Sequence, residues 1–180
     1  MSGRRGRRKA GERHPMQMTD VTVRDARPDE HRRIGELTVE VYVGGGLISP
    51  ASSYVATLAD AAGRAERSRL LVAELGGELA GAVAYCPPGS PFAQLAGLDE
   101  AEFRMLAVLG WARGHGVGRA MVRACADRAR AAGLRGLRLS TQANMTAAHR
   151  MYERMGFVRT PDRDWAPVPD ETLLTYALSL

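Results

Sequence analysis

Residues 102–108 read EFRMLAV and, after a gap of four residues, residues 113–118 read RGHGVG; these two segments decide the fold of the chain. The first segment is a short, mostly apolar run, which is typical of a strand. The second is a glycine-rich turn, and the residues after it place Met121, Cys125 and Ala129 at helical spacing. The sequence therefore predicts a strand–loop–helix unit whose helix ends at Gly133.

The glycine spacing in this loop suits an anionic ligand. Gly114, Gly116 and Gly118 allow a tight backbone turn that brings successive N–H groups toward a ligand, at the positive end of the helix dipole. Arg113 and Arg119 flank the loop and can pair with phosphate oxygens. The loop by itself predicts either a phosphate cradle or an ordinary glycine turn before a packed helix.

Two familiar nucleotide-binding loops are disfavoured by spacing. A P-loop needs Gly-Lys followed by Ser or Thr, and the chain has one lysine, Lys9. A dinucleotide-binding fold needs its glycine motif after the first strand and an acidic residue about 20 positions later, where this chain has residues 137–140. The sequence therefore argues against a kinase, an NTPase or a Rossmann dehydrogenase.

The remaining elements predict a mixed α/β sheet. Apolar periodicity and glycine or proline boundaries give the order strand, two helices, three strands, helix, strand, helix and two strands. A two-glycine turn joins two of these strands as a hairpin, so an antiparallel meander opens the sheet. The predicted strands are 21–24, 70–75, 79–85, 102–108, 137–141, one that begins at Phe157, and 173–178; the predicted helices are 28–43, one through Tyr54, Leu58, Ala61 and Ala62, one after Gly118, and one through Ala148, Met151, Tyr152 and Met155.

Two motifs in this order resemble the signatures of the GNAT superfamily of acetyl-CoA-dependent N-acetyltransferases. Residues 102–118 are similar to its acetyl-CoA motif, which contains (Arg/Gln)-x-x-Gly-x-(Gly/Ala). The segment AHRMYERMGF at 148–157 is similar to its second signature, in which a tyrosine, here Tyr152, precedes a Gly-Phe pair. The resemblance covers residues 21–178. It implies an α/β fold with a central, mostly antiparallel sheet that is splayed at the cofactor site and has helices on both faces.

The resemblance also implies the roles of particular residues. The pantetheine arm of acetyl-CoA would bond to the backbone of 106–108, where the strands at 102–108 and 137–141 separate, and loop N–H groups would hold the pyrophosphate. The hydroxyl of Tyr152 would protonate the departing thiolate, although helical spacing equally predicts a packed aromatic residue there. The implied cofactor-binding residues are Leu106, Ala107, Val108, Arg113, Gly114, His115, Gly116, Val117, Gly118, Arg119 and Asn144.

Two of the assignments have alternatives. The family often has an asparagine seven residues before the tyrosine, where this chain has Met145; Asn144, one residue earlier, is either a cofactor contact or a helix N-cap. A general base is needed because only a neutral amine attacks, and Glu102 resembles the place where some members keep a catalytic glutamate. Since Asp99 and Glu100 lie just upstream, Glu102 is alternatively a solvent-facing charge at a loop end.

By the same resemblance, the acceptor pocket lies between the 44–50 loop and the 162–169 segment. Tyr42, Tyr54 and Trp165 lie in or beside these segments, and their rings favour an apolar or cationic acceptor, or else mark a homodimer interface. No acidic cluster indicates a polyamine or an aminoglycoside. The expected acceptor is a primary amine of a small molecule or a protein.

The net charge of +5 resides in residues 1–18, where six basic residues face one acidic residue and leave 19 of each sign elsewhere. This glycine-rich arm is predicted to be disordered, followed by one domain over residues 19–180. A neutral domain disfavours nucleic acid as a partner beyond an accessory role of the arm. The arm lacks the apolar core of a secretion signal and no long apolar segment follows, which predicts a cytoplasmic protein outside the membrane. Cys86 and Cys125 are predicted to be buried thiols, and no metal is implied.

The sequence therefore predicts an acyltransferase that moves an acetyl group from acetyl-CoA, its cosubstrate, to an amine by direct transfer in a ternary complex. Tyr152 and Glu102 are its expected catalytic residues. The alternative is a domain of the same fold that binds an acyl-CoA as a regulatory or structural ligand and catalyses nothing. Thiol release in the presence of an amine separates the two.

Overall fold

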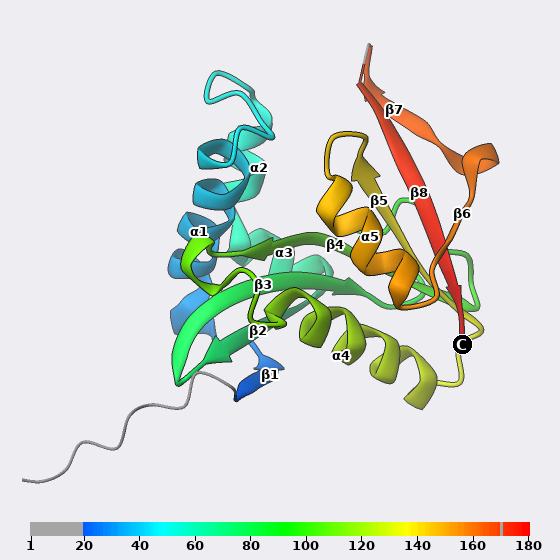
Figure 1. Cartoon of the computed structure of the whole chain (residues 1–180), viewed down its shortest axis with the longest axis horizontal. Helices are drawn as coiled ribbons and strands as arrows, with labels where there is room; N and C mark the ends of the chain where they lie inside the picture. The colour runs from blue at the N-terminus through cyan, green and yellow to red at the C-terminus, as the bar shows by residue number, and fades with distance from the viewer. Residues whose placement is uncertain (1–19, 170) are drawn as a thin grey trace, which may run out of the picture.

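The computed structural model describes residues 20–169 and 171–180, so the predicted disorder of the arm at 1–18 falls outside the described residues. One mixed sheet runs through this part of the chain in the order β1-β2-β3-β4-β5-β8-β6, with β7 paired to β8 (Figure 1). The α/β class and the mostly antiparallel sheet predicted from the sequence are confirmed.

The first half of the sheet is an antiparallel meander. It consists of β1 (Val21–Asp25), β2 (Arg69–Leu75), β3 (Glu78–Cys86) and β4 (Glu100–Val108), each antiparallel to the next. The β2–β3 turn places Gly76 and Gly77 at φ values of 61° and 85°. Both angles lie in the left-handed region, which glycine adopts without a steric penalty, so the predicted two-glycine hairpin forms.

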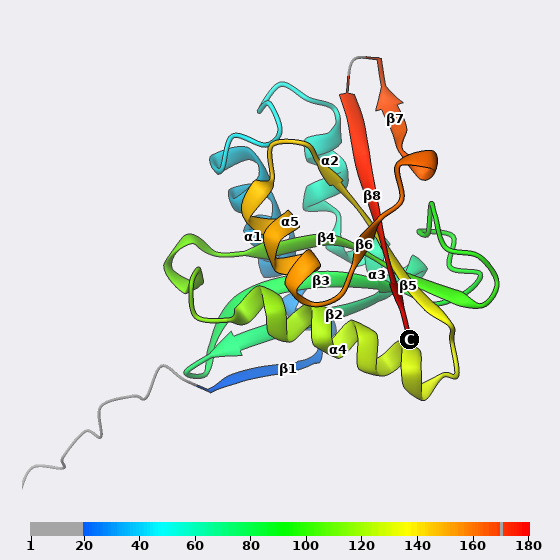
Figure 2. The same ribbon diagram turned by 45° about the vertical axis from the view of Figure 1, so that its right-hand side comes forward.

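The second half of the sheet separates from the first. β5 (Gly136–Gln142) runs parallel to β4, but the two strands pair only where Glu100–Glu102 meets Gly136–Arg138. Beyond that point β4 and β5 diverge (Figure 2), while β5 continues along β8 (Glu171–Ser179). The short β6 (Val158–Arg159) pairs with the other edge of β8. The predicted gap between the two strands is therefore present.

Helices cover both faces of the sheet. On one face lie α1 (His31–Gly44), α2 (Tyr54–Ala59) and α3 (Ala61–Arg67), with the short 3-10 turn η1 (Pro28–Glu30) before α1. On the other lie α4 (Val117–Ala131) and α5 (Thr146–Arg154). Each face has its own apolar core because side chains alternate along a strand: on β2, Leu71 packs with the α4 side and Leu70 with the α1 side. No helix in the described part of the chain combines the length and apolar character that a membrane crossing requires.

Two local features differ from the sequence expectation. The second predicted helix is two helices, α2 and α3, because the chain breaks at Asp60, whose carboxylate accepts a 2.8 Å bond from the N–H of Gly63 and caps α3. The 162–169 segment contains a strand, β7 (Trp165–Val168), where no strand was predicted. Pro167 lacks a backbone N–H, which β7 tolerates at the edge of the sheet. The short 3-10 turns η2 (Gly110–Ala112) and η3 (Pro161–Arg163) complete the fold.

Both cysteines are free and buried, as predicted. Burial raises the pKa of the Cys86 thiol to about 12 and raises that of Cys125 as well. Both side chains are therefore protonated, inert thiols at neutral pH. Within the described residues, no three His, Cys, Asp or Glu side chains form a group that could hold a metal ion.

Candidate active site

The loop between β4 and α4 forms a cradle of backbone donors. Gly114 and Gly116 both have a φ of +81°, and Gly116 is the N-cap of α4. A Cβ added at either glycine would meet no atom within 4 Å, so both positions face open space. Among the described residues, no acceptor lies within hydrogen-bond reach of the N–H groups of Gly114, Gly116, Val117, Gly118 and Arg119. Free donors at the start of a 15-residue helix are the structural requirement for binding an anion such as a pyrophosphate.

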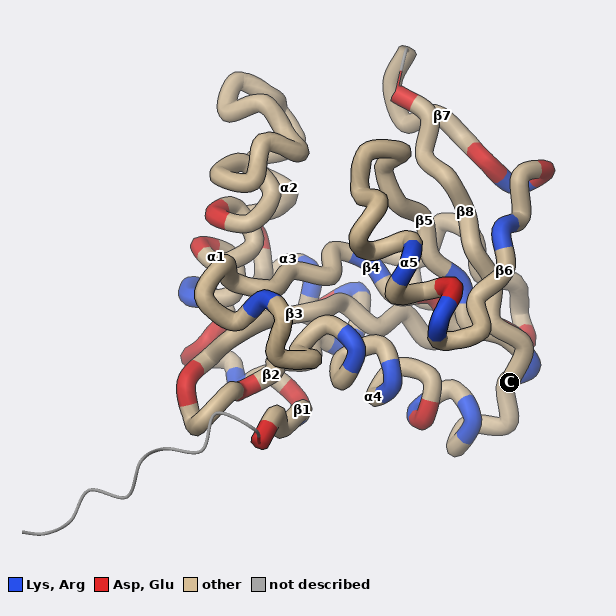
Figure 3. Tube along the Cα trace, viewed as in Figure 1, with Lys and Arg blue, Asp and Glu red and all other residues tan. Residues whose placement is uncertain are grey.

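Two arginines flank this cradle. Figure 3 shows more basic than acidic segments among the charged positions of α4. Arg128 pairs with Asp25 across the fold, whereas the exposed Arg113 and Arg119 have no ion pair with a carboxylate of the described residues. The ring Nδ1 of His115 lies 3.0 Å from the carbonyl oxygen of Arg113, inside the turn. The predicted cradle residues 113–119 thus lie together, with two arginines free to meet phosphate oxygens.

The edge of β4 beside the gap carries the second part of the predicted cofactor site. Beyond Glu102 this edge has no strand partner on its β5 side. Met105 has a φ of 52°, and the β3–β4 register shifts opposite it, so β4 bulges at this point. The hydroxyl of Tyr42 donates a 3.3 Å bond to the carbonyl oxygen of Leu106. The backbone of 106–108 therefore lines the opening, where an extended ligand could pair with it.

Tyr152 projects from α5 into the same gap. Its side chain is 3% exposed and packs on the rings of Phe103, Phe157 and Tyr176, with centroid distances of 5.9, 5.8 and 6.0 Å. It also lines a small cavity of about 30 Å³ together with Leu106. Burial raises the pKa of the Tyr152 hydroxyl, which therefore keeps its proton at neutral pH. The residue is packed among aromatic rings and also lines the small cavity, and its role as a proton donor stays a prediction.

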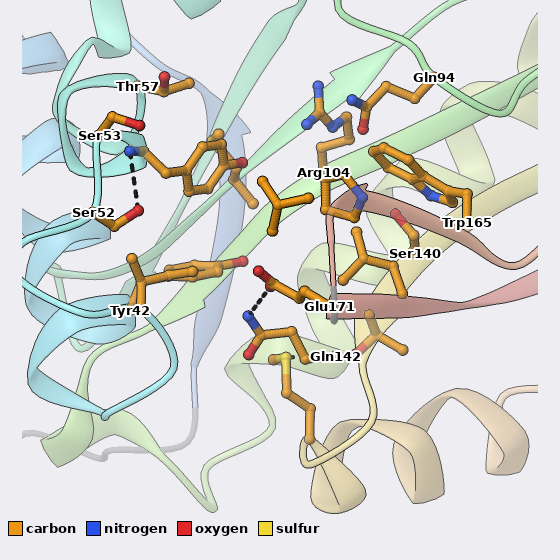
Figure 4. A pocket seen from close by; sticks show the side chains of 18 residues that line it. Tyr42, Ser52, Ser53, Thr57, Gln94, Arg104, Ser140, Gln142, Trp165 and Glu171 are labelled. Atoms are coloured by element: carbon orange, nitrogen blue, oxygen red, sulfur yellow. Dashed lines mark hydrogen bonds between the residues drawn. The ribbon is translucent and has the colours of Figure 1, made fainter.

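A larger cavity of about 380 Å³ adjoins the gap on the side of α1 and α2 (Figure 4). The three aromatic residues expected there, Tyr42, Tyr54 and Trp165, all line it, as do Ile48 from the 44–50 loop and Pro167 from β7. The cavity adjoins the small one beside Tyr152, because both are lined by Tyr42, Arg104, Met105, Ser140, Thr141 and Met145. A second substrate in this cavity would thus lie next to the gap.

Two charged side chains in this cavity were not identified from the sequence. Arg104, on β4, donates a 2.8 Å bond from Nη1 to the carbonyl oxygen of Phe92, and its guanidinium lies 4.2 Å from the centre of the Phe92 ring. Glu171, at the start of β8, accepts a 3.0 Å bond from the side-chain amide of Gln142. Alternation along β4 puts Arg104 on the face opposite Phe103, which is the one signal in the sequence that could have indicated its position.

Glu102 lies apart from the cavities, because it lines neither of them. Its side chain is 0% exposed, so it is not the solvent-facing charge of the loop-end alternative. Oε2 accepts bonds of 2.8, 2.7 and 3.3 Å from the N–H groups of Gln94, Leu95 and Ala96. Oε1 is buried without a partner among the described residues. The geometry makes Glu102 an anchor for the 94–96 loop, and its role as a base stays a prediction.

Asn144 is exposed in the turn between β5 and α5. The N-cap of α5 is Met145, which makes no side-chain cap bond, so the N-cap alternative for Asn144 is wrong. Its contact with the cofactor stays a prediction.

Comparisons with known proteins agree with this geometry. The sequence model of the acetyltransferase (GNAT) family matches residues 31–157. A GNAT-family acetyltransferase from Staphylococcus aureus Mu50 has a TM-score of 0.68 at 12% identity, covering 89% of this chain and 99% of its own. The protein yncA from Salmonella typhimurium, solved with its cofactor acetyl-CoA, has a TM-score of 0.62 at 21% identity, covering 89% and 94%. A Brucella melitensis GNAT-family acetyltransferase in complex with acetyl-CoA has 0.59 at 22%, covering 90% and 89%. The search of curated proteins gives no match.

Proposed function

Because the chain belongs to the acetyltransferase (GNAT) family, we propose that it is an N-acetyltransferase that moves an acetyl group from acetyl-CoA to a primary amine. The observation that carries this proposal is a series of adjoining parts of the molecule. It leads from the donor cradle at 114–119, along the unpaired edge of β4, to the hydroxyl of Tyr152 and into the acceptor cavity. An acyl donor on one side and an amine on the other would meet at the gap.

The described residues fit acetyl-CoA as the donor. The five free N–H groups and the open space beside Gly114 and Gly116 suit a pyrophosphate, with Arg113 and Arg119 as flanking charges. The bulged edge at 106–108 suits the amide groups of an extended arm. The relatives from Salmonella and Brucella were solved with acetyl-CoA, which supports the same donor here. When bound, acetyl-CoA supplies an activated acetyl thioester.

The residues around the gap support direct transfer. The amine nitrogen would form a bond to the acetyl carbon while the carbon–sulfur bond breaks, and the hydroxyl of Tyr152 would give its proton to the leaving sulfur. Burial keeps that hydroxyl protonated until it is needed. A covalent route through cysteine is disfavoured, since burial raises the pKa of both Cys86 and Cys125 and neither lines the acceptor cavity or the small cavity beside Tyr152.

For the proton released by the amine we propose Glu171 as the acceptor. Glu171 is a carboxylate that lines the acceptor cavity, while Oε2 of Glu102 is occupied by three backbone donors. The earlier assignment to Glu102 would need Oε1 and a water molecule to relay the proton. Comparing the pH–rate profiles of Glu171→Gln and Glu102→Gln variants separates the two assignments.

Thiol release from acetyl-CoA in the presence of a panel of amines tests the proposed function. Amine-dependent release of CoA, with acetylated amine detected by mass spectrometry, is the expected result. Tight binding of acetyl-CoA without release in the presence of any amine would contradict the transferase proposal, and it is the outcome that a non-catalytic acyl-CoA-binding domain predicts.

A further inference from the structure

The acceptor cavity contains a cation without a counter-ion. Arg104 is half-buried; Nη1 donates to the carbonyl oxygen of Phe92, and the side chain also lies beside the hydroxyl of Tyr54, so both groups that meet it here are neutral oxygens. No described carboxylate lies within 4 Å of it, in contrast to the arginines that form ion pairs across the surface of the fold. Stacking on the ring of Phe92 fixes the plane of the guanidinium. A positioned cation that faces a cavity is the usual recognition element for an oxyanion.

A second donor lies on the same side of the cavity. The indole Nε1 of Trp165 is buried and has no acceptor among the described residues, although Trp165 lines the cavity. Figure 4 shows Trp165, Gln94 and Arg104 grouped together on one side. A buried N–H without an acceptor lowers stability, and a ligand oxygen at this point would remove that cost. The indole N–H and the guanidinium are therefore two donors on the same side of the cavity.

The rest of the cavity has a different character. Glu171 and its amide partner Gln142 provide a carboxylate, and the rings of Tyr42 and Tyr54 provide apolar surface. The described lining thus contains one cationic and one anionic side chain together with aromatic, apolar and neutral polar groups. Its volume of about 380 Å³ is near the lower end of the roughly 300–1,000 Å³ typical of small-molecule sites. These features suit a small zwitterion better than a simple alkylamine or a protein side chain.

We propose that the acceptor is a small amine that also bears a carboxylate or a related oxyanion, as an amino acid does. The oxyanion binds Arg104 and the indole N–H of Trp165, and the amine points toward the gap beside Tyr152. This inference rests on the proposed transferase function and narrows its substrate class. It replaces the apolar or cationic acceptor that the aromatic residues alone indicated.

The two ends of such a molecule can be placed in adjoining cavities. Arg104 lines both the acceptor cavity and the small cavity beside Tyr152, and Leu106 lines the small one. The bulge at Met105 turns the backbone between them. A short aliphatic or aromatic amino acid can therefore bind Arg104 while its amine approaches the acyl group.

Matched acceptors test the inference. Leucine would be compared with leucinamide and isopentylamine, and phenylalanine with phenylalaninamide and phenethylamine. β-Alanine and γ-aminobutyrate would vary the distance between the amine and the carboxylate. The compound 1-aminoethylphosphonate would stand for another oxyanion. The readout is kcat/KM from thiol release at saturating acetyl-CoA. At least one oxyanion-bearing amine should exceed its neutral counterpart by about tenfold to a hundredfold, the range expected for charge-assisted hydrogen bonds. The carboxylate and phosphonate arms identify which oxyanion is preferred.

Variants assign that preference to the two donors. Arg104→Gln should abolish it mainly through a higher KM, Arg104→Lys should restore part of it, and Trp165→Phe should reduce it by about tenfold. The control Arg128→Gln removes a comparably exposed arginine whose partner is Asp25, and it should leave the preference unchanged. None of these variants should alter the affinity for acetyl-CoA.

The failure of the inference differs from the failure of the proposed function. If neutral amines are acetylated as well as or better than their oxyanion-bearing counterparts, the inference is overturned and the transferase stands. An oxyanion preference that persists unchanged in Arg104→Gln also overturns it. If CoA is not released in the presence of any amine while acetyl-CoA still binds, the proposed function fails and the inference fails with it.

Discussion

The substitution Glu102→Gln tests whether Glu102 anchors the 94–96 loop or accepts the proton of the amine as a general base. The glutamine keeps the shape of the side chain and removes its charge. Its amide oxygen can still accept bonds from the 94–96 loop, but as a neutral acceptor. Hydrogen bonds to a charged group contribute about 1.5–3 kcal/mol and neutral ones about 0.5–1.5 kcal/mol, a difference of about 1 kcal/mol for each bond.

Two of the three bonds to Oε2 are short, at 2.8 and 2.7 Å, and the third is longer, at 3.3 Å. The expected loss in the free energy of unfolding is therefore about 2–3 kcal/mol. In a chain of 180 residues, each kcal/mol lowers Tm by roughly 2–4 °C, so Tm should fall by roughly 5–10 °C.

Urea and thermal unfolding followed by circular dichroism measure this loss. The matched control is Glu40→Gln on the exposed side of α1, which should change the unfolding free energy by less than about 0.5 kcal/mol. The pH–rate profile of acetylation should keep its shape in Glu102→Gln and lose its acid limb in Glu171→Gln. Unchanged stability together with a lost acid limb in Glu102→Gln would refute the anchoring role and make Glu102 the base.

Three further predictions test separate parts of the structure. Tyr152→Phe should lower kcat for acetylation by about 100-fold without changing the affinity for acetyl-CoA, and an unchanged kcat would exclude its role as general acid. Gly116→Ala forces a Cβ into a left-handed conformation and should cost about 1–2 kcal/mol of unfolding free energy. Gly118→Ala is its control, because a Cβ there would meet its neighbours at ordinary distances of 3.5–3.8 Å and should cause no such loss. Equal losses of the two variants in urea would contradict the backbone argument. The ion pair with Arg24 holds the pKa of Glu30 at about 2, below its ordinary value, so its contribution to stability is present above the ordinary pKa and is lost as the pH falls from about 5 toward 2. The urea midpoint of Glu30→Gln should therefore fall less than that of the original protein over this range, and parallel curves would exclude the ion pair as a source of acid sensitivity.

The elements that were predicted correctly are those with strong local signals. Gly76 and Gly77 fix the β2–β3 hairpin, and the glycines of 113–118 separate β4 from α4, because few other residues adopt these backbone angles. The break at Asp60 was missed because apolar residues continue at helical spacing on both sides of it, while the capping bond that ends one helix and starts the next is visible only in three dimensions.

The cofactor side of the site was more predictable than the acceptor side. A cradle is formed by consecutive residues, so the 113–118 segment reveals it. The acceptor cavity is formed by single side chains from several elements, including Arg104 on β4, Trp165 on β7 and Glu171 on β8, and no pattern in the sequence brings these together. The burial of Glu102 depends on a loop six to eight residues upstream that turns three N–H groups toward it.

The most direct test of the central claim is a calorimetric titration of the purified protein with acetyl-CoA. The same titration would be repeated on an Arg113→Ala, Gly116→Trp double variant that fills the cradle, and on Arg113→Ala, Arg119→Ala, which leaves the backbone unstrained. Circular dichroism would confirm that both variants are folded. Micromolar binding to the original protein that is lost in the first variant and weakened in the second is the predicted result. No binding to the original protein, or equal binding to all three, would contradict the assignment of 113–119 as the acetyl-CoA site.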